Sequence, residues 1–151
     1  GNGKDNAHRQ SGLQNNKAEL GGIMDFEVYG VALDPQLSNL HVLTAGVGFA
    51  PMEKSTLDLV FHHYRQDKLA ALDNERTNLR PRADQQNERA LGNGIDLIWG
   101  WRPNKQWRVE VAAGVFLPSG RFRQSDKADA DKARNVYAGN VEITYYPNWT
   151  F

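Results

Sequence analysis

The chain has 151 residues, with 18 Lys and Arg balanced by 18 Asp and Glu, and it contains no cysteine. This length fits a single domain. The balanced charge argues against a nucleic-acid binder, which normally carries a basic excess. The lack of cysteine excludes disulfides and zinc–thiolate sites. No apolar run approaches the roughly 18 residues of a transmembrane helix, and the polar first ten residues lack the apolar core of a signal peptide.

The mean hydropathy of −0.65 does not exclude a membrane protein that crosses the bilayer with strands. Strands of a transmembrane β-barrel alternate apolar and polar residues, so their average hydropathy is unremarkable. The period of the hydrophobic pattern must therefore decide between a soluble and a membrane-embedded β protein.

Six segments are predicted as strands, most of them because apolar and polar residues alternate with a period of two. In chain order they are residues 24–29, 40–49, 57–62, 94–102, 106–117 and 137–151. The clearest is 106–117, where Trp107 and Val109 alternate with Arg108 and Glu110. In 94–102, Ile98 breaks the alternation. Because no long segment shows a helical stripe, we predict an all-β antiparallel chain, with residues 1–20 as a polar loop or lead-in and the strands in 21–151.

The connections between these strands alternate in length. Residues 66–91 and 118–134 are long and charged, whereas residues 51–54 and 103–105 form short turns. This alternation is typical of outer-membrane barrels, which carry long loops outside the cell and short turns in the periplasm. We therefore predict an antiparallel transmembrane β-barrel whose long outer loops could fold over its mouth.

Aromatic residues gather near the predicted periplasmic end of these strands. Rings of this kind suit a membrane interface, where an apolar body meets a polar edge. The alternative is the ordinary hydrophobic core of a soluble β-sandwich binding domain. The predicted interface residues are Trp99, Trp101, Trp107, Tyr145, Trp149 and Phe151.

Several stretches resemble known outer-membrane proteins. The ending VEITYYPNWTF resembles the C-terminal strand signal that the barrel-assembly machinery reads. Four further strings resemble the C-terminal part of the alginate-export family, over about residues 8–151: HRQSGLQNNKAEL, DPQLSNLHVLTAGVGF, STLDLVFHHYRQDK and GNGIDLIWGWRPNKQWRVEVAAGVFLPSGRF.

The resemblance implies a monomeric barrel of about eighteen strands in the outer membrane of a Gram-negative bacterium, in contact with membrane lipid and lipopolysaccharide. It also implies transport of an anionic polysaccharide or small organic solute through an arginine-rich constriction. Six strands are fewer than the roughly eight of the smallest bacterial barrels. We therefore expect the chain to form the C-terminal part of a larger barrel.

Alternation predicts which polar side chains face the lumen. Those residues are Asp25, Glu27, Asp58, His62, Asp96, Arg102, Arg108, Glu110 and Glu142. Because a pore for anions presents fixed positive charge, Arg102 and Arg108 are the best candidates for contact with the solute. In the alternative interpretation they form structural ion pairs with Asp96 and Glu110 across neighbouring strands. Six acids against two arginines depart from the arginine-rich pattern that the family implies.

Other chemistry has weaker support. His62 and His63 are adjacent on a predicted strand and so point to opposite faces, which argues against a metal site; no cofactor is expected. The enzymatic alternative is a small outer-membrane barrel enzyme acting on lipid A. Ser38 lies near His41 in the sequence, but no acid–His–Ser signature accompanies them. We therefore predict a transport protein without enzymatic activity.

Overall fold

The computed structural model describes residues 17–20, 24–27, 29–35, 38–73, 76–82, 87–124 and 133–147. Every regular element in these ranges is a β-strand, and every strand pair is antiparallel, as predicted. No helix in this part of the chain is long and apolar enough to cross a membrane.

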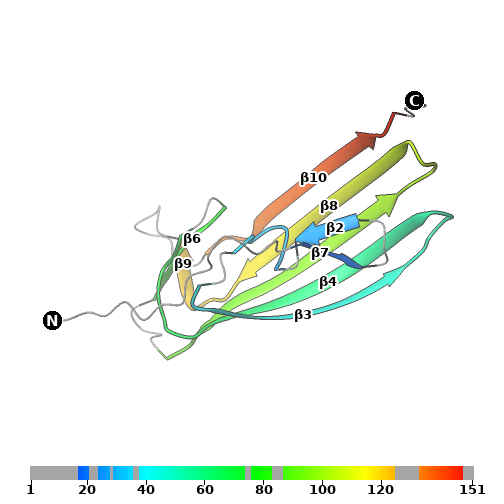
Figure 1. Cartoon of the computed structure of the whole chain (residues 1–151). Helices are drawn as coiled ribbons and strands as arrows, with labels where there is room; N and C mark the ends of the chain where they lie inside the picture. Colours follow the sequence, from blue (N-terminus) through cyan, green and yellow to red (C-terminus); the bar gives the residue numbers. More distant parts are fainter. Residues whose placement is uncertain are drawn as a thin grey trace.

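One long five-stranded sheet dominates the molecule (Figure 1). Its order is β10-β8-β7-β4-β3, formed by β3 (Leu40–Phe49), β4 (Ser55–Gln66), β7 (Ala90–Trp101), β8 (Trp107–Pro118) and β10 (Val136–Tyr145). These strands contain 10 to 12 residues each. A transmembrane strand needs about 9–11 residues, so each is long enough to cross the hydrocarbon layer.

Short and long connections lie at opposite ends of this sheet. At one end Phe49 pairs with Leu57 and Trp101 with Val109, so β3–β4 and β7–β8 are joined by short turns. At the other end the long connections leave β4 and β8. The predicted segregation of loop lengths is confirmed.

The two faces of the sheet differ sharply in chemistry. Odd-numbered positions, except Ser55 and Leu91 near the strand ends, form an outer face with exposed large apolar side chains. They include Leu43, Val47, Phe49, Leu59, Phe61, Ile95, Leu97, Trp107, Tyr137, Val141, Ile143 and Tyr145. Even-numbered positions form an inner face, on which both apolar and charged side chains are buried.

The two long connections, predicted as patternless loops, contain short strands that pair with each other. β5 (Leu72–Asp73), β6 (Asn78–Pro81) and β9 (Phe122–Gln124) form a three-stranded sheet, in which Pro81 pairs with Phe122. The sequence gives no alternation here because these strands are too short to show a period. The small sheet adjoins the long-connection end of the main sheet (Figure 1).

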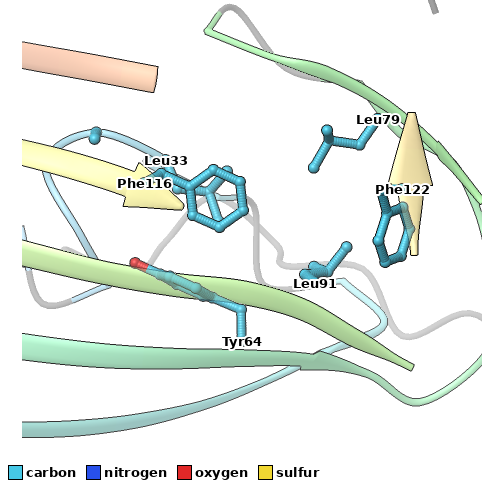
Figure 2. Close-up of a cluster of buried hydrophobic side chains, with 7 residues drawn as sticks. Leu33, Tyr64, Leu79, Leu91, Phe116 and Phe122 are labelled. Carbon is cyan, nitrogen blue, oxygen red and sulfur yellow. The ribbon is translucent and has the colours of Figure 1, made fainter. Parts of the chain in front are cut away.

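A hydrophobic cluster joins the long connections to the main sheet. Leu79 and Phe122 come from the small sheet, and Tyr64, Leu91 and Phe116 come from β4, β7 and β8 (Figure 2). All five are fully buried. Burying each large apolar side chain contributes about 1.5–3 kcal/mol, so this cluster fixes the long connections over one end of the sheet.

The predicted first strand, residues 24–29, does not join the main sheet. β1 (Lys17–Leu20) and β2 (Met24–Glu27) form a separate two-stranded sheet, which leaves five rather than six strands in the main sheet. With four residues each, they are too short to cross a membrane. β1 also falls in the range 1–20 that we predicted to be loop. Asp25 and Glu27 therefore belong to this small hairpin, not to the sheet face shared by the other predicted lumen residues; their side chains lie outside the described part.

The main sheet is open over the described residues. β3 and β10 each have one neighbour in it, so both present an unpaired edge. The predicted antiparallel all-β architecture is present, whereas barrel closure is not seen within these ranges.

Candidate functional site

The inner face of the main sheet collects most of the predicted lumen residues. Asp58, His62, Asp96 and Glu110 are between 0% and 4% exposed. They come from three neighbouring strands, because even-numbered positions of β4, β7 and β8 point to one side. One carboxylate oxygen each of Asp58 and Asp96 has no hydrogen-bond partner within the described part.

His62 lies at the centre of a hydrogen-bonded series across three strands. Its Nε2 lies 3.1 Å from Asp96 Oδ2, and its Nδ1 lies 2.9 Å from Thr44 Oγ1. A neutral ring satisfies both contacts when Nε2–H donates to the carboxylate and Nδ1 accepts the threonine hydroxyl; this tautomer is inferred from the partners. The series fixes the Asp96 carboxylate in one orientation.

His63 points to the opposite face, as predicted for its neighbour in a strand. Its Nδ1 lies 2.9 Å from Asn93 Oδ1 on β7. The two adjacent histidines therefore have separate partners on separate faces. Within the described residues, no group of three or more His, Asp or Glu side chains could hold a metal ion.

Arg108 forms ion pairs with acids of the same face. Its Nε lies 3.2 Å from Glu110 Oε1, and its guanidinium also lies 3.9 Å from Glu142 on β10. The ion pairs considered from the sequence were pairs across neighbouring strands, whereas Arg108 and Glu110 pair within β8. Asp96 has different partners from those expected, since His62 and the Val31 amide bind its carboxylate.

Arg102 contacts an aromatic ring in the structure. It follows the last residue of β7 and is exposed at the short-turn end. Its guanidinium carbon lies 5.9 Å from the centre of the Tyr146 ring, within cation–π range. The two arginines therefore differ in their contacts, although each lies one residue beyond the Trp101–Val109 pair on neighbouring strands.

A segment without an alternating pattern covers part of the inner face. Within residues 29–35, called the inner segment below, Val31, Ala32 and Leu33 are 6%, 1% and 1% exposed. Val31 packs with Val60, Ile98 and Ala112. Ile98, the exception to alternation, is therefore an inner-face residue covered by Val31. The only sequence signal was three apolar residues between Gly30 and Asp34, too short to show a period.

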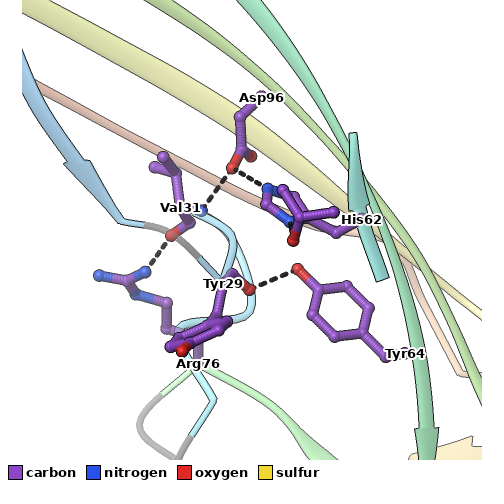
Figure 3. A network of polar contacts seen from close by, with 7 residues as sticks. Tyr29, Val31, His62, Tyr64, Arg76 and Asp96 are labelled. Carbon is purple, nitrogen blue, oxygen red and sulfur yellow. Dashed lines mark hydrogen bonds and ion pairs between the residues drawn. The ribbon is translucent and has the colours of Figure 1, made fainter. Parts of the chain in front are cut away.

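Polar contacts fix the inner segment to the sheet (Figure 3). The Val31 amide donates to Asp96 Oδ2 at 2.8 Å, and the Tyr64 hydroxyl donates to the Tyr29 carbonyl at 2.6 Å. Arg76, from the first long connection, donates to the Val31 carbonyl.

The predicted interface aromatics within the described part lie together at the short-turn end. Trp99 and Trp101 stack with ring centres 6.2 Å apart, and Trp107 lies 4.8 Å from Tyr145 on the neighbouring strand. Trp149 and Phe151 lie outside the described residues.

Comparison with protein families gives a match to the model for alginate export over residues 2–136. The chain belongs to the alginate-export family. This confirms the resemblance seen in the sequence. Proteins of the alginate-export family are outer-membrane proteins of Gram-negative bacteria, which assigns the chain to the outer membrane. No curated protein matches the chain.

Proposed function

We propose that this member of the alginate-export family forms part of the wall of an outer-membrane channel. The observation that carries the proposal is the distribution of side chains on the main sheet. Leu59 and Leu97 are each 49% exposed on the outer face, while Asp58 and Asp96 are each 1% exposed on the inner face. A soluble sandwich would bury the apolar face instead. A lipid-facing outer surface accounts for the exposed leucines, and the inner segment that binds Asp96 covers part of the polar inner face.

Closure of the barrel requires further strands against β3 and β10. Unpaired edges in hydrocarbon are prohibitively costly because lipid tails offer no hydrogen bonds. We infer that other strands pair with both edges in a complete, monomeric barrel that contacts lipid and lipopolysaccharide and assembles through the barrel-assembly machinery. "Complete barrel" below means that assembly.

The solute is proposed to be hydrophilic, either a polysaccharide or a small organic molecule. The described inner face does not present the cationic ring that an anion would favour. Arg108 is shared between Glu110 and Glu142, and Asp58 and Asp96 add negative charge. If the solute is an acidic polysaccharide, as the family name suggests, the cationic contacts come from other parts of the lumen.

We infer that the chain moves its solute without covalent chemistry. The enzymatic alternative depended on Ser38 and His41. His41 is exposed on β3, two positions from Leu43 and therefore on the same outer face, while Ser38 precedes the strand. The enzymatic alternative requires a His/Ser/Asp group near the outer rim, but the cross-strand partner of His41 is Arg65, a cation and not an acid.

The test is conductance of the complete barrel in a planar lipid bilayer. We expect stable single-channel currents that fall when an alginate oligosaccharide is added on one side, and that fall less with a neutral dextran of equal length. Absence of channels would contradict the proposal. Folding of the chain without detergent into a soluble monomer would favour the β-sandwich alternative.

A further inference from the structure

We propose that the inner segment is a fixed strap inside the lumen, held by Asp96, and that it sets the largest solute that passes. This inference rests on the proposed channel function, because the inner face is a lumen only if the sheet is part of a barrel wall. The proposal assigns Asp96 as a positioning residue for the strap, with no direct role toward solute.

The first support is the chemistry of the Asp96 contact. A carboxylate that accepts a backbone N–H forms a charge-assisted bond, roughly twice as strong as one between neutral groups. The Val31 N–Asp96 Oδ2 bond of 2.8 Å is buried. His62 binds the same oxygen at 3.1 Å, so the acceptor is already oriented when the strap docks.

The second support is that the strap is held from both sides. Tyr64, on the sheet, donates to the Tyr29 carbonyl at the start of the strap. Arg76, in the long connection, binds the Val31 carbonyl and lies 3.6 Å from the Asp34 carboxylate. A segment joined both to the wall and to the outer connection is a fixed constriction, not a freely moving loop.

The third support is that two glycines allow the strap to approach the sheet closely. Gly114 lies on β8 directly opposite Asp96. A Cβ at Gly114 would lie 2.2 Å from Asp96 Oδ1 and 3.0 Å from Val31 Cβ. Gly30 has φ +107, and the Asp34 amide bonds to its carbonyl at 2.9 Å, which closes the strap into a turn.

These contacts have a consequence for the cross-section of the channel. A layer packed on a sheet stands roughly 10 Å above it, so the strap removes a similar depth from the lumen on this side. Releasing it widens the lumen at the level of Asp96 and His62, without altering the strand pairs of the wall.

The first experiment measures pore size in the complete barrel. Asp96→Ala removes the acceptor, Arg76→Gln weakens the outer attachment, and Gly114→Val pushes the strap from the sheet. We expect each to raise single-channel conductance, by about 1.5-fold or more for Asp96→Ala, and to admit larger polyethylene glycols. Gly120→Val is the matched control, because nothing lies within 4 Å of its added Cβ.

A second measurement, thiol labelling, does not depend on conductance. Because the chain has no native cysteine, a single introduced cysteine is the only thiol that can react. Ala32→Cys is a small change at a position 1% exposed. In the folded barrel this thiol should react with a maleimide at least about tenfold more slowly than Gly120→Cys, and Asp96→Ala should remove the protection.

The outcomes separate the two proposals. Channels whose conductance and polymer cut-off are unchanged by Asp96→Ala would overturn the strap's sizing role and leave the channel function standing. Rapid labelling of Ala32→Cys in the folded barrel would overturn the docking itself. Absence of channels in every variant, with Ala32→Cys protected, would instead contradict the channel function.

Discussion

Arg108 and Glu110 lie two residues apart on β8 and form an ion pair of 3.2 Å on its inner face. Glu110 is 4% exposed, so Arg108 lies beside a buried carboxylate. Glu142 on β10 approaches the same guanidinium at 3.9 Å. One arginine thus serves two acids, and the trio has a net negative charge.

Arg108→Ala should therefore destabilise the barrel and increase its preference for cations. Removing the guanidinium takes one ion-pair partner from the buried Glu110 carboxylate, at a cost of about 1–3 kcal/mol. The measurements are the temperature at which the folded form disappears on an unheated-versus-boiled gel, and the reversal potential under a salt gradient. Arg108→Ala/Glu110→Gln is the matched control and should recover much of the stability. An unchanged reversal potential would remove Arg108 from the lumen.

Leu97→Arg should impair assembly into membranes. Leu97 is 49% exposed in the middle of β7 on the outer face. An arginine on the lipid face near the midplane costs about 2–4 kcal/mol. The measurement is the folded fraction after refolding into lipid vesicles across a urea series.

Met52→Arg is the control for that prediction, because Met52 is an exposed apolar residue in the short turn rather than on a strand. It should fold as the unmodified chain does. If Leu97→Arg folded equally well, the outer face would not contact hydrocarbon.

The alternation of apolar and polar residues predicted the long strands, each of which has one apolar face and one polar face. β8 has Val109 and Val111 on one face and Arg108 and Glu110 on the other. Over its 12 residues this difference repeats often enough to show a period of two. The same reasoning placed His62 and His63 on opposite faces. The alternation did not predict the Arg108–Glu110 pair within β8, since the ion pairs considered from the sequence joined neighbouring strands.

The positions of residues 24–29 and of the inner segment could not be predicted, because they depend on contacts between distant segments. Residues 24–29 alternate like a strand of the main sheet, but β2 pairs with β1 as a four-residue hairpin, and four residues cannot show which sheet they join. The inner segment has no period at all, because its position is set by single contacts from Asp96, Tyr64 and Arg76. Such contacts leave no local pattern.

Gly92→Ala should be strongly destabilising. Gly92 has φ +147, beside an irregularity where the β4–β7 register shifts between Tyr64 and Arg65. An added Cβ would lie 2.2 Å from the Leu117 carbonyl oxygen, a backbone atom that cannot move without disturbing β8. We expect a loss of at least about 1–3 kcal/mol in the free energy of unfolding. Urea unfolding in vesicles measures it, with Gly120→Ala as a control that should change little. Equal stability of the two variants would contradict this account.

Trp107 and Tyr145 should stabilise the short-turn end through their direct contact. They are paired across β8 and β10, with ring centres 4.8 Å apart. Aromatic pairs contribute about 0.5–1.5 kcal/mol beyond the area they bury. A double-mutant cycle of Trp107→Ala, Tyr145→Ala and the double variant, followed by urea unfolding in vesicles, should give a coupling energy in that range. The stacked pair Trp99 and Trp101 lies on β7 and provides the comparison, because substituting Trp99 should couple only weakly to Tyr145. Additive effects of Trp107→Ala and Tyr145→Ala would show that each ring acts through its own contact with lipid rather than through the other.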